Sequence, residues 1–174
     1  MNKLILRPII SVEDKNIFIS EIQEAFQNAY IKEFGEFEKT ILPTNDIEES
    51  FNERGAEAYV AEIDGERVGG AIIIIDNKTN CNSLDLLYVK ANSQNTGNRF
   101  KIWKAIEKLH PETRIWETHT PYFDKRNIHF YVNRCGFKIV EFFNPKHKDS
   151  HQTSETAGNI PEENNYFFRF EKEM

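Results

Sequence analysis

A polar loop at residues 90–99 is the segment of the chain best suited to binding an anion. It lies between an apolar segment and an amphipathic helical pattern, so it leads directly into the start of an expected helix. The first N–H groups of a helix lack intrahelical partners and carry partial positive charge, which suits a phosphate. Gly97 would let the backbone approach such a ligand closely, and Arg99 and Lys101 add full charges. Taken alone, a loop with one glycine more often is an ordinary connection between a strand and a helix.

The same loop argues against two common nucleotide-binding classes. It lacks the Gly-Lys-Ser/Thr ending of the loops that hydrolyse nucleoside triphosphates. It also lacks the Gly-x-Gly-x-x-Gly pattern of dinucleotide-binding folds. The phosphate-bearing ligand expected here therefore belongs to another class.

A second informative segment covers residues 124–137 and reads Asp-Lys-Arg-Asn-Ile-His-Phe-Tyr-Val-Asn-Arg-Cys-Gly-Phe. Together with Gln94-x-x-Gly97-x-Arg99, it resembles the GCN5-related N-acetyltransferase (GNAT) superfamily. The first segment resembles the pyrophosphate loop of that family, and the second resembles its helix-to-strand ending. Each motif is degenerate, so the resemblance rests on their joint occurrence at the right separation and on the matching order of elements along nearly the whole chain.

Two positions depart from the pattern of the family. Arg99 stands where a second small residue is usual, and such a cation could crowd the helix start or donate to a phosphate. Asp124 stands where many members carry Asn, and Asn127 follows one helical turn later, on the same face as Tyr131. These departures motivate an alternative function, a non-catalytic acyl-CoA-binding or regulatory module on the same scaffold. A ligand-free oligomerisation module is a third hypothesis.

The resemblance implies transfer of the acetyl group of acetyl-CoA to a primary amine, by direct attack in a ternary complex. The acceptor, a small amine or a peptide amine, is not identified by the sequence. The residues implied to bind the cofactor are Leu87, Tyr88, Val89, Gln94, Asn95, Thr96, Gly97, Asn98, Arg99 and Asn127.

The reaction needs a proton donor for the departing thiolate and a base for the protonated amine. Tyr131 occupies the position of the usual phenol donor of the family. Asp85, within an apolar strand pattern, and Glu117, near the end of the next strand, are the candidate bases. A carboxylate held in an apolar strand would have a raised pKa. Asp85 could equally be a buried structural acid, and Glu117 a solvated charge at a strand end.

Apolar periodicity and turn signals predict the elements that must position these groups. Expected strands cover 4–8, 58–63, 66–75, 84–89, 114–118, 137–143 and 166–170, and expected helices cover 12–31, 45–54, 98–110 and the segment that ends at Gly136. This order predicts one α/β domain over 1–174. By the resemblance, its sheet is mixed, mostly antiparallel and twisted, with six to seven strands and helices on both faces.

Composition limits the partners and the location that we expect. The 174 residues carry a net charge of −6, which disfavours a broad nucleic-acid or anionic-membrane surface. Neither a signal peptide nor a membrane-spanning run is evident, and the two cysteines form no disulfide framework, so we expect a cytoplasmic protein. A homodimer is compatible with the resemblance. No metal is expected. His119 could line the acceptor pocket, but it is interpreted by default as a loop residue, Cys135 as a packing residue, and 144–163 as a polar loop.

Overall fold

The computed structural model describes residues 3–93, 96–149 and 160–174. Its helices are α1 (Val12–Phe34), α2 (Thr44–Asn52), α3 (Asn98–Leu109) and α4 (Lys125–His129), with short turns η1 (Ala91–Ser93), η2 (Phe130–Arg134) and η3 (Glu162–Asn164). Its strands are β1 (Leu4–Pro8), β2 (Ala56–Ile63), β3 (Glu66–Ile74), β4 (Cys81–Val89), β5 (Ile115–Pro121), β6 (Lys138–Phe143) and β7 (Phe167–Glu173).

The described strands form one sheet in the order β1-β2-β3-β4-β5-β7-β6. Only the β4–β5 pair is parallel, and every other neighbouring pair is antiparallel. The mixed, mostly antiparallel sheet predicted from the sequence is therefore confirmed. The strand that reads as apolar on both sides, β4, lies in the middle of the sheet, where both of its faces are covered.

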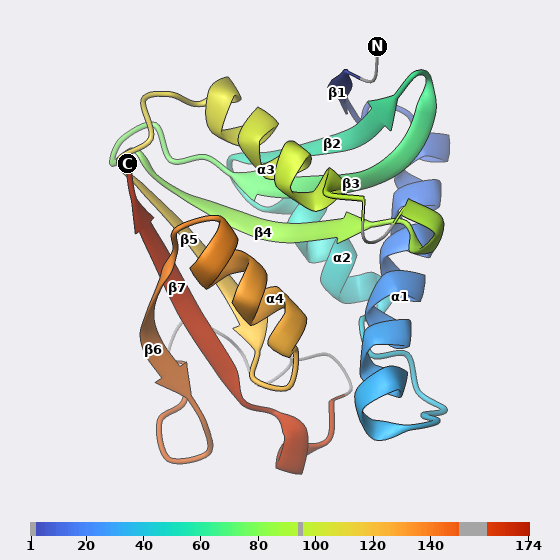
Figure 1. The fold of residues 1–174 in the computed structure, drawn as a ribbon, viewed down its shortest axis with the longest axis vertical. Helices are drawn as coiled ribbons and strands as arrows, with labels where there is room; N and C mark the ends of the chain where they lie inside the picture. Colours follow the sequence, from blue (N-terminus) through green and yellow to red (C-terminus); the bar gives the residue numbers. More distant parts are fainter. Residues whose placement is uncertain (1–2, 94–95, 150–159) are drawn as a thin grey trace.

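The central strands separate partway along their length, and this opening dominates the architecture (Figure 1). β4 pairs with β5 only from Cys81 to Leu84, opposite Ile115 to Thr118. Beyond that point β4 continues to Val89 beside β3, whereas β5 continues to Pro121 beside β7. Part of the backbone edge of each strand that faces the opening therefore has no sheet partner in the described chain.

A bulge in β4 lies directly at the point of separation. Leu84 pairs with Ile73 and Leu86 pairs with Ile72, so Asp85 is an extra residue on the β4 side. Bulges of this kind bend a strand and increase its twist. The bulge therefore gives a local reason for β4 to turn away from β5 just after Leu84.

Helices cover both faces of the sheet, as the strand and helix order predicts (Figure 1). Helix α3 and the α4–η2 segment pack on one face, with Trp103, Trp116 and Phe137 fully or almost fully buried among them. Helices α1 and α2 cover the other face, where Phe18 and Ile47 are buried. Two apolar layers thus hold the separated strands in place from opposite sides.

Local sequence signals fix several element boundaries. Ser11 caps α1 by accepting a hydrogen bond from the backbone N–H of Asp14, at 3.0 Å. Asp64 and Gly65 both have positive φ, 53° and 82°, which matches the tight hairpin turn between β2 and β3. α1 runs three residues further than predicted, to Phe34, and β7 extends to Glu173, because sheet pairing with β5 continues there.

The helix that ends at Gly136 is less regular than its pattern indicates. After His129 the backbone widens, and the N–H of Cys135 bonds to the carbonyl of Phe130, five residues earlier, at 3.0 Å. Widened turns of this type are frequent at functional sites. The apolar pattern still places Tyr131 and Cys135 in the core, as predicted.

A glycine in β3 allows the layers to approach closely beside the end of β4. A Cβ built on Gly69 would lie 2.3 Å from the backbone oxygen of Tyr88 and 3.1 Å from Cδ1 of Ile102 in α3. A methyl group at this position therefore cannot fit unless β4 or α3 moves.

We predict that Gly69→Ala lowers the free energy of unfolding by about 1–3 kcal/mol, the usual cost of overpacking. Urea denaturation followed by circular dichroism measures this change. A variant as stable as the unaltered protein would contradict the close approach of β4 to β3.

Candidate functional site

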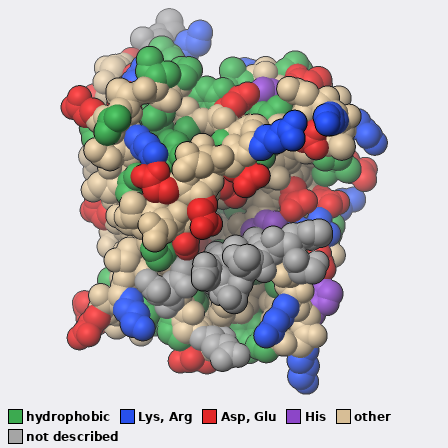
Figure 2. All heavy atoms as spheres, turned by 180° about the vertical axis from the view of Figure 1, so that it is seen from behind, with side chains coloured by type: hydrophobic (Ala, Val, Ile, Leu, Met, Phe, Trp, Pro, Cys, Tyr) green, Lys and Arg blue, Asp and Glu red, His purple; other side chains and the backbone are tan. Residues whose placement is uncertain are grey.

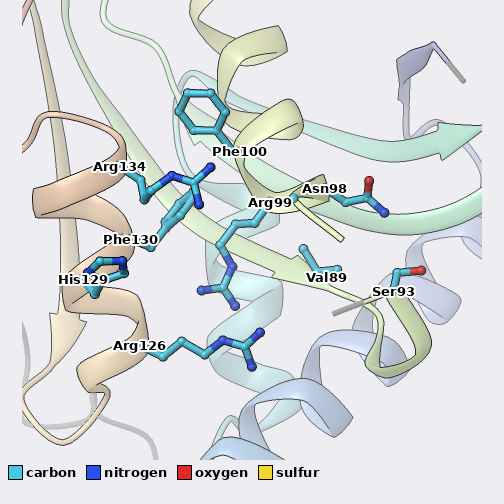
Figure 3. Close-up of a pocket in the computed structure, with 10 residues that line it drawn as sticks. Val89, Ser93, Asn98, Arg99, Phe100, Arg126, His129, Phe130 and Arg134 are labelled. Atoms are coloured by element: carbon cyan, nitrogen blue, oxygen red, sulfur yellow. The ribbon is translucent and has the colours of Figure 1, made fainter. Parts of the chain in front are cut away.

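A cavity of about 240 Å³ opens at the N-terminal end of α3 (Figure 3). It lies between α3, the α4–η2 segment and the last residue of β4. Its walls are formed by Val89, Ser93, Gly97, Asn98, Arg99, Phe100, Arg126, His129, Phe130 and Arg134. The structure thus brings the predicted anion loop and the second informative segment together around one space.

The backbone at the start of α3 is arranged to leave N–H groups available to a ligand. Gly97 precedes the helix in the left-handed conformation, with φ 78° and ψ 4°, and it provides no side-chain cap. The backbone of Asn98, Arg99 and Phe100 therefore begins a helix whose first N–H groups have no intrahelical acceptor. An anion in the cavity would satisfy these groups and would meet the positive end of the helix dipole.

Positive side chains concentrate at this cavity although the whole chain is acidic. Three arginines and one histidine line it, and none of the described residues in its wall is a carboxylate. Figure 3 shows the guanidinium groups of Arg99 and Arg126 extending into the space between the helices. A local field of this kind attracts phosphate groups whatever the net charge of the molecule.

Neighbouring side chains hold the arginines in position. Arg99 donates to the side-chain oxygen of Asn127 and lies over the ring of Phe130, 5.3 Å from its centroid. Arg134 lies over the ring of Phe100 at 5.2 Å. These contacts join α3 to the α4–η2 segment, so the cations are preorganised before a ligand arrives.

The two departures from the family pattern both have a structural role. Asp124 caps α4 by accepting a hydrogen bond from the N–H of Asn127 at 3.0 Å, and its burial raises the pKa of its carboxyl. Arg99 does not block the helix start, because its side chain extends along the cavity toward α4. Asn127, predicted to contact the cofactor, has its carbonyl oxygen engaged by Arg99.

The other residues predicted to bind the cofactor occupy different positions. Val89 lines the cavity, Leu87 packs in the core below α3, and the ring of Tyr88 faces the opposite core against Phe18. The hydroxyl of Thr96 donates to the backbone oxygen of Ser93. Gln94 and Asn95 lie outside the described residues.

Tyr131 is buried close to the point where β4 and β5 separate. Its hydroxyl lies within hydrogen-bonding reach of Thr118, whose own hydroxyl donates to the backbone oxygen of Leu84 at 2.8 Å. Burial raises the pKa of Tyr131 to about 12, so the phenol keeps its proton at neutral pH. The side chain predicted to be a proton donor is thus protonated and placed at the opening of the sheet.

Both candidate bases lie near the same opening, toward the face covered by α1 and α2. Asp85 lies in the β4 bulge and borders solvent, and the protein packed around its carboxyl, near Ser50, raises its pKa by desolvation. Glu117 lies on β5, with its carboxylate 3.5 Å from Arg169. Figure 2 shows acidic side chains gathered around a hollow on this side of the molecule, with histidine atoms beside them.

His119 belongs to β5, so its interpretation as a loop residue is wrong. The strand continues to Pro121 because β7 pairs with it beyond the end of the β4–β5 ladder. His119 therefore has the fixed direction of a strand residue and projects beside Glu117, with its Nε2 atom 3.9 Å from Glu117 Oε1.

Sequence reasoning also missed Arg126, His129 and Arg134 as cavity residues. Arg126 and His129, three residues apart, share a side of a regular helix, and this signal could have been found. Arg134 lies in the segment where the backbone is widened, which that spacing does not reveal. These basic residues form a binding cavity only together with α3, which supplies the opposite wall. The sequence of residues 124–137 does not say where α3 lies.

Among the described residues, no helix combines the length and apolar character needed to cross a membrane. The described part of the chain also contains no group of three or more His, Cys, Asp or Glu side chains arranged to hold a metal ion. The imidazole of His147 pairs its Nε2 atom with Glu141, at 2.6 Å.

Comparisons with known proteins agree with this geometry. The model of the acetyltransferase (GNAT) family matches residues 19–137, which include both informative segments. The uncharacterized protein YrkN of Bacillus subtilis is 51% identical over 135 residues, which are 77% of this chain and 73% of that protein. The likeness to this protein extends over most of both chains.

Several solved structures share the fold at low sequence identity. An IAA acetyltransferase from Bacillus cereus superposes with a TM-score of 0.70 at 14% identity, covering 99% of this chain and 100% of the other. A Bacillus subtilis acetyltransferase in complex with CoA gives 0.66 at 17% identity, covering 100% and 99%. A spermidine N-acetyltransferase from Vibrio cholerae, in complex with CoA and spermine, gives 0.67 at 15% identity, covering 98% and 95%.

The environment of Cys135 leads to a chemical prediction about the wall behind the site. Cys135 is buried, and burial raises the pKa of its thiol to about 12, whereas Cys81 is exposed. We predict that iodoacetamide at pH 8 labels Cys81 and leaves Cys135 unmodified until the protein is denatured, because the thiolate is the reactive form. Peptide mass spectrometry measures the two sites, and rapid labelling of native Cys135 would contradict its packing role.

Proposed function

Because the chain belongs to the acetyltransferase (GNAT) family, we propose that it transfers the acetyl group of acetyl-CoA to a primary amine by direct attack in a ternary complex. The observation that carries this proposal is the cationic cavity at the start of α3, beside the separation of β4 and β5. The cavity supplies charge for phosphate groups, and the separated strands supply an opening for the reacting groups. Residues 1–174 act as one catalytic domain in this proposal.

The cavity fits the diphosphate of CoA by charge and by donor type. Backbone N–H groups from the loop and from the first turn of α3 would hold it, assisted by Arg99 and its neighbours. The edge of β4 from Asp85 to Val89 has no β5 partner, so its backbone groups are available to an extended arm such as pantetheine. Val89 joins this edge to the cavity, because it ends β4 and lines the cavity.

Tyr131 is the proposed donor of a proton to the departing thiolate. Its phenol is protonated at neutral pH and lies beside Thr118, at the end of the β4–β5 ladder. The carboxylates of Asp85 and Glu117 lie toward the α1–α2 face of the same opening, where an ammonium group would be attracted. The group that would protonate the thiolate and the groups that would attract the acceptor amine therefore lie toward opposite faces of the sheet.

The acceptor class is proposed from charge and from the comparisons. Acidic side chains around the hollow favour a cationic amine (Figure 2), and the Vibrio cholerae relative in fold was solved with spermine. A cytoplasmic location and a homodimer stay predictions from the sequence. The free cysteines Cys81 and Cys135 are compatible with a reducing compartment.

Gly97 provides a test of cofactor binding with a matched control. A Cβ at this position would meet no atom of the described residues within 4 Å, so neither Ala nor Asp clashes with them and the two variants differ chiefly in charge. We predict that Gly97→Asp weakens CoA binding at least tenfold more than Gly97→Ala, because a carboxylate would face the diphosphate. Isothermal titration calorimetry measures both affinities, and equal affinities would place the diphosphate elsewhere.

Tyr131 separates an enzyme from a non-catalytic CoA-binding module. We predict that Tyr131→Phe lowers kcat for acetyl transfer roughly 10²-fold and leaves CoA affinity unchanged, because only the proton donor is removed. Thiol release with a panel of primary amines gives the rate, and calorimetry gives the affinity. An unchanged rate would reject Tyr131 as donor, and CoA binding without transfer to any amine would favour the non-catalytic module.

A further inference from the structure

One nitrogen atom at the opening of the sheet lacks the hydrogen bond that its burial calls for. Nε2 of His119 is buried and has no hydrogen-bond partner in the described structure. Its nearest charged neighbours are Oε1 of Glu117 and Oδ2 of Asp149, each 3.9 Å away and beyond hydrogen-bonding distance. A buried polar atom without a partner is costly, so such an atom at a functional opening points to a ligand that completes it.

The position of His119 on β5 relates it directly to the reaction. Thr118 is the last β5 residue paired with β4, and its hydroxyl lies beside Tyr131 on the face covered by α3 and α4. His119 is the next residue, so its side chain projects to the opposite face. The proposed proton donor and the unpartnered imidazole therefore lie on opposite sides of the same point of β5.

The ring of His119 has a defined orientation. It stacks on Phe143 with the ring centroids 6.0 Å apart and an interplanar angle of 23°. Its side chain is 28% exposed, so the imidazole is packed in the wall and still borders solvent. The stacking fixes the direction of the ring, which preorganises it for a bound ligand.

From these contacts we propose that Nε2 of His119 takes the proton from the acceptor amine, an inference that rests on the proposed acetyl transfer. The charged groups that face it are Asp85 on β4, Glu117 on its own strand, Asp149 after β6, and Arg169 on β7. The three carboxylates would attract an ammonium group to the imidazole. Burial lowers the pKa of His119 despite these carboxylates, so the ring is neutral and ready to accept a proton at pH 7.

The two carboxylates predicted from the sequence have polar groups close to them, whereas Nε2 of His119 has no hydrogen-bond partner among the described residues. Glu117 forms an ion pair with the guanidinium of Arg169, at 3.5 Å. Asp85 has a raised pKa, chiefly through desolvation, and its carboxyl lies close to the Ser50 hydroxyl. We therefore assign these carboxylates to binding the ammonium group and His119 to accepting its proton.

One turnover exchanges the C–S bond of the thioester for a C–N bond and releases one proton. The ammonium group gives one proton to His119, and the free amine forms a C–N bond with the acetyl carbon. The C–S bond breaks, and the sulfur takes a proton from Tyr131, which recovers one from the new amide nitrogen through solvent. His119 then releases its proton to solvent, so each turnover yields an N-acetyl amine, CoA thiol and one proton.

A pH–rate profile of His119→Gln tests this role, with n-propylamine, spermidine and Nα-acetyl-lysine amide as acceptors. For the unaltered protein, kcat/KM should fall at acidic pH with a midpoint below 6.5, as His119 becomes protonated. In His119→Gln, kcat should fall roughly 10²-fold or more, and the residual rate should rise with pH as free amine forms. CoA affinity, measured by calorimetry, should be unchanged and shows that the variant is folded.

His147→Gln is the matched control. His147 stacks on the same Phe143 ring at 5.7 Å, but its side chain is 56% exposed and its Nε2 atom is paired with Glu141. This variant should keep the rate and the acidic limb of the unaltered protein. A second substitution, His119→Asn, should reproduce the loss seen with Gln if the proton acceptor is what matters.

Two results would overturn the inference, and they are distinguishable. If the unaltered protein acetylates an amine while His119→Gln or His119→Asn keeps its rate or its acidic limb, His119 is not the base and the acetyltransferase proposal stands. If the unaltered protein transfers acetyl to none of the three probes nor to a wider set of primary amines, the proposed function fails and this inference fails with it.

Discussion

The separation of β4 from β5 after the Leu84–Thr118 pair is the constraint on which the site depends. A continuous parallel ladder would occupy the backbone edge of β4 and would close the space between the faces of the sheet. The bulge at Asp85 turns β4 away, and β3 and β7 keep each separated strand within the sheet. Because apolar cores lie on both sides, the opening is held by packing and does not depend on a ligand.

The opening divides the chemistry between two faces of one sheet. On the α3–α4 face, a cavity rich in arginine suits an anionic cofactor, and Tyr131 keeps its proton through burial. On the other face, carboxylates surround His119, which suits a cationic acceptor. A protein with a net charge of −6 thus presents clusters of opposite charge on the two faces of one sheet.

The sequence predicted the elements well where a local signal exists. The hairpin at Asp64-Gly65, the helix after Gly97 and the central apolar strand all follow from turn chemistry and periodicity, and the family resemblance ordered them into the observed sheet. The candidate site was less predictable, since it depends on contacts between distant segments. The side-chain oxygen of Asn127 is engaged by an arginine 28 residues earlier, and His119 belongs to a strand only because β7 pairs with it. Neither contact leaves a trace in local spacing.

A structure of the protein with acetyl-CoA bound is the most direct measurement of the central claim. We expect the diphosphate against Gly97, Asn98 and Arg99 at the start of α3, and the acetyl group in the opening between Tyr131 and His119. An acetyl-CoA molecule bound away from the β4–β5 separation, or with its diphosphate remote from α3, would contradict this expectation.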